Sequence, residues 1–248
     1  MKVFATYNIK GGVGKTATAV NLAYLAAASG ARTLIWDLDP QGAATFYFRI
    51  RAKIKGGGKK LVRGRSDLDS LIRGTDFEGL DLLPADFSYR NMDLALEKTN
   101  KPTKRLARLL QPLAAEYDTL FLDCAPSISL VSESVFVAAD ALLVPTIPTT
   151  LSLRTLDQLC RHLDDRNKRR PMVMPFFCMI DRRKSLHRRI SDSIDSNTHG
   201  MLETRIPYSS VVEQMGLHRA PLAVFAGRSQ PARAYGELWR EIGSRMRP

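Results

Sequence analysis

The segment Lys10-Gly-Gly-Val-Gly-Lys-Thr16 constrains this chain most strongly, because it joins a strand pattern directly to a helix pattern. The strand pattern covers Lys2–Tyr7, and an Ala- and Leu-rich helix pattern runs from Lys15 to Ser29. Glycines expose backbone N–H groups that can surround phosphate oxygens, and a helix N-terminus adds positive potential. The segment therefore predicts a phosphate-binding loop (P-loop), in which Lys15 reaches the β- and γ-phosphates and the Thr16 hydroxyl binds Mg²⁺.

This loop departs from the strict P-loop pattern G-x-x-x-x-G-K-[ST] at two positions. Ile9 stands where the first glycine belongs, and a second lysine, Lys10, lies inside the loop. The flanking strand and helix supply the context that the motif requires, so the interpretation as a P-loop holds. The ordinary motif does not account for Lys10.

Strand and helix patterns alternate along the rest of the chain, which predicts an α/β fold. We expect a P-loop NTPase with a mainly parallel, doubly wound central sheet flanked by helices on both faces. The length suits a single domain over residues 1–248. The further strands expected are Thr33–Asp37, Leu80–Pro84, Thr119–Asp123, Ala141–Pro145, Met172–Ile180 and Thr204–Ile206, and the further helices include Thr103–Glu116, Leu153–Asp165 and Ala232–Arg245.

Acidic residues stand at the carboxyl ends of two expected strands. Asp123 ends Thr119–Asp123, while Asp37 and Asp39 close the strand that begins at Thr33. Alternation along a strand places Asp37 and Asp39 on the same side, facing the crevice where parallel sheets bind ligands. Carboxylates there can hold Mg²⁺, usually through water, so all three acids are candidates for a site shared with the P-loop.

The composition is that of an ordinary globular protein, with 44% hydrophobic and 25% charged residues. No stretch approaches the ~18 to 20 consecutive apolar residues of a membrane span. The N-terminus lacks the apolar run of a signal peptide, so we expect none. Cys124, Cys160 and Cys178 have no metal-ligand spacing, which favours reduced thiols in a cytosol.

The chain is strongly basic, with a net charge of +12 from 37 Lys and Arg and 25 Asp and Glu. Residues 161–248 hold seventeen basic and nine acidic side chains, so +8 of the excess lies in the last third. Such an excess attracts polyanions, because each neutralised phosphate releases condensed counterions. Nucleic acid is the favoured partner; an anionic membrane and a merely solvated basic surface are the alternatives.

A basic insertion at about residues 49–66 interrupts the alternation of strands and helices. Arg49–Arg65 carries eight Lys or Arg and no Asp or Glu. Its three consecutive glycines argue against a continuous helix. We expect an exposed basic loop or a twisted hairpin, which either serves a partner or is only solvated.

Together these motifs resemble the ParA/MinD family of deviant Walker-A ATPases. The matching segments are Lys10–Thr16, Asp37–Gly42 and Leu122–Ser127, and weaker matches extend nearly to the end of the chain. The Pro-Gln pair after Asp39 is more similar to the ParA branch than to the MinD branch. Because the chain begins directly at its first strand, it resembles the small ParA form that has no operator-binding domain.

The resemblance implies ATP and Mg²⁺ as cofactors and an ATP-dependent sandwich dimer. Lys10 matches the family's signature lysine, which crosses the interface to the partner's phosphates, and Asp39 matches the acid that orients the attacking water. Lys10, Lys15 and Asp39 are thus the implied catalytic residues. Thr16 and the Walker-B acid Asp123 would hold the metal, with Asp37 close to it. The implied nucleotide-binding residues are Lys10, Gly11, Gly12, Val13, Gly14, Lys15, Thr16, Ala17 and Pro207.

In the ParA branch, the ATP-bound dimer binds double-stranded DNA non-specifically, and a ParB-like or cargo-adaptor protein stimulates hydrolysis. The resemblance implies a cytoplasmic, nucleoid-associated ATPase, weak unless stimulated, that segregates or positions a plasmid, a chromosome or a protein cargo. Relatives usually carry arginines after Ile206-Pro207, where this chain has Tyr208 and Val211. The candidate DNA-binding residues are Arg182, Arg183, Lys184, Arg188, Arg189, Arg219, Arg228 and Arg233.

Three other functions are weighed against this one. A MinD-like, membrane-cycling ATPase is the main alternative, because an apolar stripe recurs at helical spacing near the C-terminus. The same stripe would also suit a helix that packs on the sheet, which we favour. A metabolic P-loop enzyme would need a second-substrate site, and a metal-cluster carrier would need a C-x-x-C pair, which is absent. The stripe consists of Tyr235, Leu238, Trp239, Ile242 and Met246.

Overall fold

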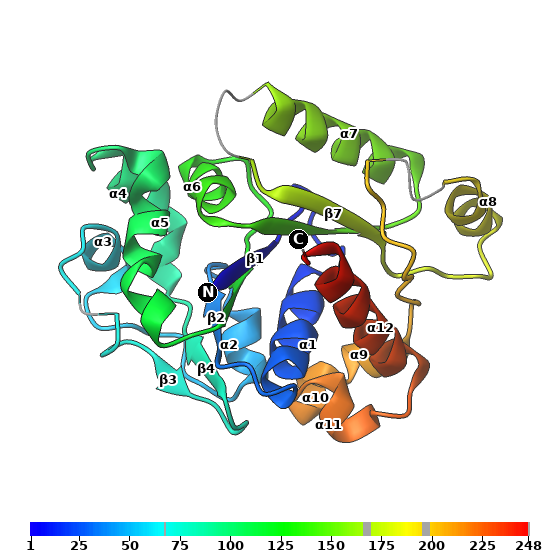
Figure 1. Cartoon of the computed structure of the whole chain (residues 1–248), viewed down its shortest axis with the longest axis horizontal. Helices are drawn as coiled ribbons and strands as arrows, with labels where there is room; N and C mark the ends of the chain where they lie inside the picture. The colour runs from blue at the N-terminus through cyan, green and yellow to red at the C-terminus, as the bar shows by residue number, and fades with distance from the viewer. Residues whose placement is uncertain (67, 166–169, 195–198, 248) are drawn as a thin grey trace.

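The computed structural model describes residues 1–66, 68–165, 170–194 and 199–247. Its centre is a seven-stranded sheet in the order β3-β4-β2-β5-β1-β6-β7 (Figure 1). All neighbouring strands pair in parallel except β3 with β4. This confirms the expected α/β fold with a mainly parallel sheet. The strands are β1 (Lys2–Thr6), β2 (Thr33–Asp37), β3 (Arg73–Gly74), β4 (Leu80–Leu83), β5 (Thr119–Asp123), β6 (Ala141–Thr146) and β7 (Met172–Phe177).

Helices cover both faces of the sheet, because successive strand residues point to opposite sides. In β1, Val3 and Ala5 belong to one buried cluster and Phe4 belongs to the other. The first cluster lies under α3 (Gly57–Val62), α4 (Met92–Glu97), α5 (Arg105–Leu110), α6 (Leu130–Ala138), α7 (Thr150–Asp164) and α8 (Ser185–Ser193). The second lies under α1 (Lys15–Ala28), α2 (Ala43–Tyr47), α10 (Met215–His218), α11 (Leu222–Ala226) and α12 (Gln230–Arg245), with α9 (Ser210–Glu213) beside them (Figure 1).

The register of the central strands brings the predicted acids together. Thr6 of β1 and Asp37 of β2 both pair with Asp123 of β5, at the carboxyl ends of the three strands. The P-loop follows β1 at the same edge of the sheet. Strand pairing alone therefore places two of the three acids next to the loop.

The C-terminal apolar stripe packs on the sheet, as expected. Tyr235, Leu238 and Ile242 on α12 are buried in the second cluster. The indole ring of Trp239 contacts the rings of Phe4 and Phe121. No helix among the described residues is long and apolar enough to cross a membrane.

Most expected elements differ from the observed ones by a few residues at their ends, and three differ more. The strand expected at Met172–Ile180 ends at Phe177, and Met179 has a positive φ of 57°. The segment Thr204–Ile206 is not a strand, although Ile206 and Tyr208 donate backbone hydrogen bonds to Phe177 and Ile180. The helix expected at Thr103–Glu116 is broken, because Pro112 lacks the N–H that would continue α5. Short 3₁₀ turns occupy Phe87–Asn91, Pro102–Lys104 and Pro112–Ala115.

The basic segment, residues 49–66, is neither a free loop nor a hairpin. It contains α3, whose Leu61 and Val62 are fully buried in the first cluster. The glycines contribute to this packing, since a β-carbon on Gly58 would lie only 2.8 Å from the Tyr89 ring. The expectation of an exposed loop is wrong for this part, because Leu61 and Val62, three and four positions after the last glycine of the run, anchor a helical turn in the core.

Candidate nucleotide-binding site

The P-loop has the backbone that its glycines predict. Gly12 and Gly14 adopt positive φ angles of 69° and 95°, a region that favours glycine. A β-carbon on Gly14 would also lie 2.9 Å from the sulfur of Cys178, which is buried beneath the loop. Helix α1 begins at Lys15, so its N-terminal N–H groups face the loop. Gly14 is thus required both by conformation and by lack of space.

The two lysines of the loop lie in different environments. Lys15 is only 7% exposed, and its Nζ donates a hydrogen bond of 3.1 Å to the carbonyl oxygen of Lys10. Burial lowers the pKa of Lys15, while the nearby Asp123 opposes that shift. Lys10 itself is exposed. One lysine is therefore held inside the site, and the other lies exposed on the loop.

Asp123 lies at the bottom of the site and is completely buried. Its Oδ1 accepts a hydrogen bond of 3.3 Å from the Thr6 hydroxyl, whereas its Oδ2 has no hydrogen-bond partner among the described residues. Burial and the neighbouring Asp37 raise the pKa of Asp123 well above its ordinary value. An unsatisfied, buried carboxylate oxygen beside Thr16 fits a bound cation, directly or through water, because either would supply the missing partner.

Asp37 has both carboxylate oxygens engaged by the protein. Its Oδ1 accepts from the Asp39 N–H at 3.2 Å, and its Oδ2 accepts from the Thr45 N–H at 2.8 Å and the Thr45 hydroxyl at 2.7 Å. Burial raises the pKa of Asp37 to about 6, although these hydrogen bonds oppose the shift. Asp37 therefore holds the segment from Asp39 to Thr45 in place. Of these two buried acids, Asp123 is the one with a carboxylate oxygen that lacks a hydrogen-bond partner among the described residues.

Asp39 borders a cavity of about 450 Å³ that the P-loop also lines. Its Oδ1 accepts a hydrogen bond of 2.9 Å from the Gln41 N–H, which fixes the turn after β2. The predicted residues Gly11, Gly12, Gly14, Lys15, Thr16, Ala17 and Pro207 line the same cavity. Two of the predicted nucleotide-binding residues do not line it: the side chain of Val13 is buried under the loop, and Lys10 is exposed outside the cavity.

The far side of this cavity is mostly apolar. Tyr47 of α2, Met179 after β7, and Val212 of α9 contribute to its wall, and Tyr208 lies beside Pro207. Such a wall suits a flat, partly apolar ring next to a phosphate loop. Sequence reasoning missed Tyr47, Met179 and Val212, because nothing in their local pattern indicates that three distant segments meet there.

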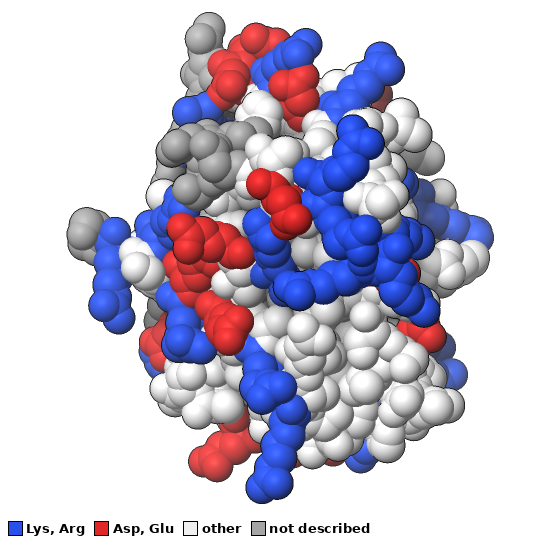
Figure 2. Space-filling model, turned by 90° about the vertical axis from the view of Figure 1, so that its right-hand side faces the viewer, with Lys and Arg blue, Asp and Glu red and all other residues white. Residues whose placement is uncertain are grey.

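The candidate DNA-binding residues fall into separate groups. Figure 2 shows Lys and Arg gathered in a band across one face. Arg182, Arg183 and Arg188 border a hollow of about 450 Å³ next to the nucleotide cavity, and Lys184 and Arg189 belong to the same exposed segment. Arg219 is elsewhere: its guanidinium stacks on the Phe46 ring. Arg228 and Arg233 are exposed near the start of α12.

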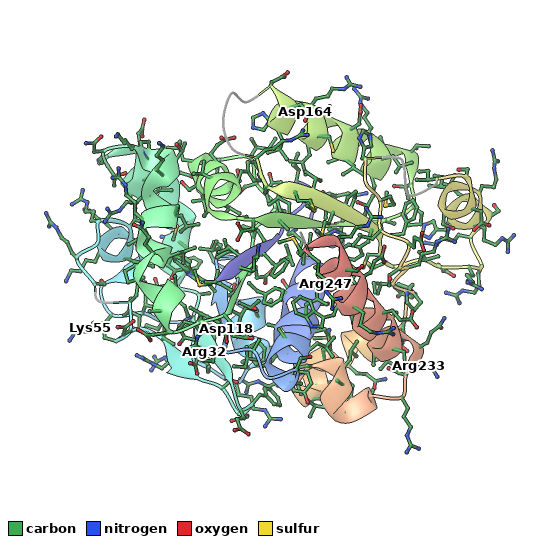
Figure 3. The ribbon with its side chains drawn as sticks, viewed as in Figure 1. Arg32, Lys55, Asp118, Asp164, Arg233 and Arg247 are labelled. Carbon is green, nitrogen blue, oxygen red and sulfur yellow. The ribbon has the colours of Figure 1, made fainter. Side chains whose placement is uncertain are left out.

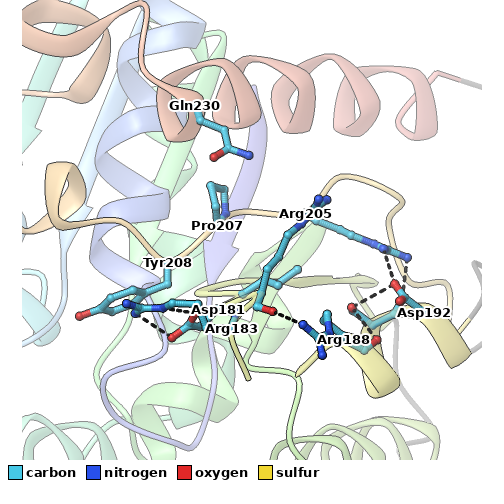
Figure 4. A pocket seen from close by; sticks show the side chains of 11 residues that line it. Asp181, Arg183, Arg188, Asp192, Arg205, Pro207, Tyr208 and Gln230 are labelled. Carbon is cyan, nitrogen blue, oxygen red and sulfur yellow. Dashed lines mark hydrogen bonds and ion pairs between the residues drawn. The ribbon is translucent and has the colours of Figure 1, made fainter. Parts of the chain in front are cut away.

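Several arginines in the hollow are held by acids or carbonyl groups (Figure 4). Arg183 donates two hydrogen bonds to Asp181, of 2.9 and 3.0 Å, which lower the pKa of Asp181 to about 2. Arg205, which sequence reasoning missed, reaches Asp192 from the segment after α8. The Arg182 guanidinium has no partner among the residues that the structure describes.

The fold and the loop define the class: an α/β P-loop protein with a cavity for a nucleotide. The AAA domain family matches residues 1–173. The chromosome partitioning protein ParA of Caulobacter vibrioides strain NA1000 is 30% identical over 100% of this chain and 96% of its own length. The chain belongs to the ParA/MinD family of deviant Walker-A ATPases.

Solved structures agree with this assignment of the fold. A putative plasmid partition protein from Borrelia burgdorferi bound to AMPPNP has a TM-score of 0.85 at 20% identity, with 99% of each chain covered. Cobyrinic acid a,c-diamide synthase from Mycobacterium smegmatis, with a bound ATP analogue and magnesium, has a TM-score of 0.79 at 25% identity, covering 98% of this chain and 94% of that one.

Proposed function

We propose that this chain is a ParA-like positioning ATPase. It binds ATP and Mg²⁺, forms an ATP-dependent sandwich dimer and binds double-stranded DNA without sequence preference. Hydrolysis is slow until a ParB-like or cargo-adaptor protein stimulates it, and the cargo is a plasmid, a chromosome or a protein assembly. The chain would work in the cytoplasm, associated with the nucleoid. The Caulobacter relative, named a chromosome partitioning protein, supports this branch of the family.

The observation that carries the proposal is that the two lysines of the loop, Lys10 and Lys15, lie in different environments. Lys15 is buried and already directed inward by its bond to the Lys10 carbonyl oxygen. Lys10 is exposed on the same loop. A second copy facing this loop would receive the Lys10 charge at its own phosphates, as an arginine finger acts elsewhere.

The other site residues take complementary roles. Lys15 would bind phosphate oxygens, and Thr16 and Asp123 would hold Mg²⁺, which supplies charge neutralisation when bound. Asp39, which borders the cavity, would orient the attacking water, while Asp37 keeps the Asp39 segment in position. Pro207 and Tyr208 would flank the base. The solved relative that holds an ATP analogue and magnesium supports this choice of cofactors.

The decisive experiment measures molecular mass by light scattering with ATP and Mg²⁺ for the parent, Lys10→Ala and Lys2→Ala. Lys2 is exposed at the opposite end of β1 and serves as the matched control. We expect the parent and Lys2→Ala to dimerise with ATP and the Lys10→Ala variant to remain monomeric while still binding nucleotide. A Lys10→Ala variant that dimerises and turns over like the parent would contradict the proposal.

The burial of three residues of the C-terminal stripe weighs against the membrane-cycling alternative. Its apolar stripe required Tyr235, Leu238 and Ile242 to face a lipid surface, but these side chains are buried against the sheet.

A further inference from the structure

The basic segment presents its charges from a firmly anchored support. Arg51, Lys53, Lys55, Lys59 and Lys60 are exposed. The backbone beneath them is held by buried Ile54, whose N–H donates to Asp86 Oδ2 at 2.9 Å, and by the buried apolar side chains of α3. Cations on an ordered surface lose little freedom when a partner binds, so this segment is suited to recognition.

Between the basic segment and β3 lies a hollow of about 620 Å³. Arg51, Lys53, Lys55 and Arg73 line it together with two isoleucines, Ile50 and Ile54, and no acidic side chain contributes to its lining. The hollow therefore combines positive charge with apolar surface.

An exposed aromatic residue extends the apolar part of this surface. The 3₁₀ turn Phe87–Asn91 packs beside α3, where the N–H of Gly58 donates to the Ser88 hydroxyl. Within that turn, Phe87 is 60% exposed, and the Arg90 guanidinium lies 4.2 Å from the centre of its ring. The turn that packs beside α3 therefore adds an exposed aromatic side chain to the cations of the basic segment.

The basic segment also touches the loop that carries Asp39. A β-carbon on Gly42 would lie 3.1 Å from the β-carbon of Ala52, so the segment rests directly on the turn after Asp39. The strand end beside Asp86 makes a second connection, because the Ala85 N–H donates to the Thr45 hydroxyl at 2.9 Å, and Thr45 donates to Asp37. If the basic segment moved when a partner bound, these contacts would also displace the loop that carries Asp39.

Most of this surface lies away from the candidate DNA-binding residues near the start of α12, although Arg49, at the beginning of the basic segment, donates a hydrogen bond to the carbonyl oxygen of His218, the residue before Arg219. Lys55 lies at one end of the long axis of the molecule and Arg233 lies towards the other, as Figure 3 shows. Lys55 and Arg233 can therefore contact different partners at the same time.

We propose that the basic segment, with its hollow and Phe87, binds an acidic segment of a partner protein in which Asp or Glu alternates with apolar side chains. Binding there acts on the Asp39 loop and changes the rate of ATP hydrolysis. This inference rests on the proposed partner-stimulated ATPase. An acidic peptide with apolar side chains fits better than duplex DNA, because phosphates would satisfy the cations but leave the partly exposed Ile50 and the exposed Phe87 without an apolar partner.

The test uses a fluorescein-labelled peptide of alternating Glu and Leu, with a second peptide in which Gln replaces every Glu. We expect the acidic peptide to bind the parent and to change its ATP turnover. Lys53→Glu/Lys55→Glu should lower the affinity about tenfold or more, and Lys53→Gln/Lys55→Gln should lower it less. Arg240→Glu/Arg245→Glu, an equal charge change on exposed positions of α12, should bind like the parent.

Several results would overturn the proposal. Equal binding by the parent and Lys53→Glu/Lys55→Glu, or equal binding of both peptides, would exclude recognition of acids by this surface. Loss of affinity for labelled duplex DNA, with no binding of either peptide, would make it a second DNA site instead. Peptide binding without a change in turnover would refute the coupling to Asp39. Peptide affinity is measured without ATP, so a failure of the parent to dimerise remains distinguishable. Thermal unfolding checks that each variant is folded.

Discussion

Asp37 holds Thr45 through a single carboxylate oxygen, which accepts hydrogen bonds from the Thr45 N–H at 2.8 Å and the Thr45 hydroxyl at 2.7 Å. The same hydroxyl accepts a hydrogen bond of 2.9 Å from the Ala85 N–H. Thr45 thus links the end of β2 to the segment after β4. Both Asp37 and Thr45 are fully buried, so no water replaces these bonds if one is lost.

Replacing Thr45 tests this link. Thr45→Val keeps the size of the side chain but leaves the Ala85 N–H without its acceptor, so we expect a loss of about 1 to 3 kcal/mol in the free energy of unfolding. Thr45→Ser keeps the hydroxyl and should be clearly less destabilised. Urea unfolding of the three proteins measures the difference. Equal losses for the two variants would show that the hydroxyl does not make the link.

Asp39→Asn and Asp39→Ala separate the charge of this residue from its role in the turn. Asparagine can still accept the hydrogen bond that the Gln41 N–H donates to Asp39, but it cannot act as a carboxylate. We expect both variants to bind ATP and dimerise, with turnover reduced by about 100-fold or more. Steady-state phosphate release and light scattering give the two readouts. Normal turnover in Asp39→Asn would remove the carboxylate from the mechanism.

Charge reversal at Arg182 and Arg183 tests the candidate DNA interface. Each lost phosphate contact should reduce the steepness of log K against log salt by about 0.9. We therefore expect Arg182→Glu/Arg183→Glu to bind random-sequence duplex DNA more weakly and with a shallower salt dependence, while ATP-dependent dimerisation is kept. Arg240→Glu/Arg245→Glu controls for net charge. An unchanged salt slope in the first variant would place the DNA contacts elsewhere.

The ion pair between Arg32 and Asp118 predicts a specific dependence of stability on pH. The two residues lie next to each other at the amino-terminal edge of the sheet (Figure 3), and their closest atoms are 2.7 Å apart. Hydrogen bonds from Arg32 lower the pKa of Asp118 from 3.8 to about 2. Folding therefore favours the ionised carboxylate, and the stabilisation is present above about pH 4 and lost as the pH falls through about 2.

We expect Asp118→Asn to be less stable than the parent near neutral pH, and the difference to shrink as the pH is lowered from about 4 towards 2. Urea unfolding over a series of pH values measures it. Because the pair is exposed, high salt should also reduce the difference. A difference that stays constant down to the lowest pH would show that Asp118 does not act through its charge.

Local patterns in the sequence were sufficient for the fold class and the phosphate loop. The positive φ angles of Gly12 and Gly14 could be expected from the sequence, because glycine alone adopts such angles without steric cost. Asp37 and Asp123 could be placed near that loop because parallel strands share one carboxyl edge. The packing of the C-terminal stripe was also predictable, since an apolar helix face buries itself whenever a sheet is available.

Only the tertiary structure decided what the remaining residues do. Nothing near Leu61 in the sequence predicts that a lysine- and glycine-rich stretch folds into a helical turn, because its stability comes from a core built by distant segments. The bond from Ala85 to Thr45 spans 40 positions, and Arg205 reaches Asp192 across an intervening segment. The hollow beside β3 likewise joins residues on both sides of α3. Such contacts depend on how helices, strands and loops pack against each other. The local conformational preferences of the residues do not determine that packing.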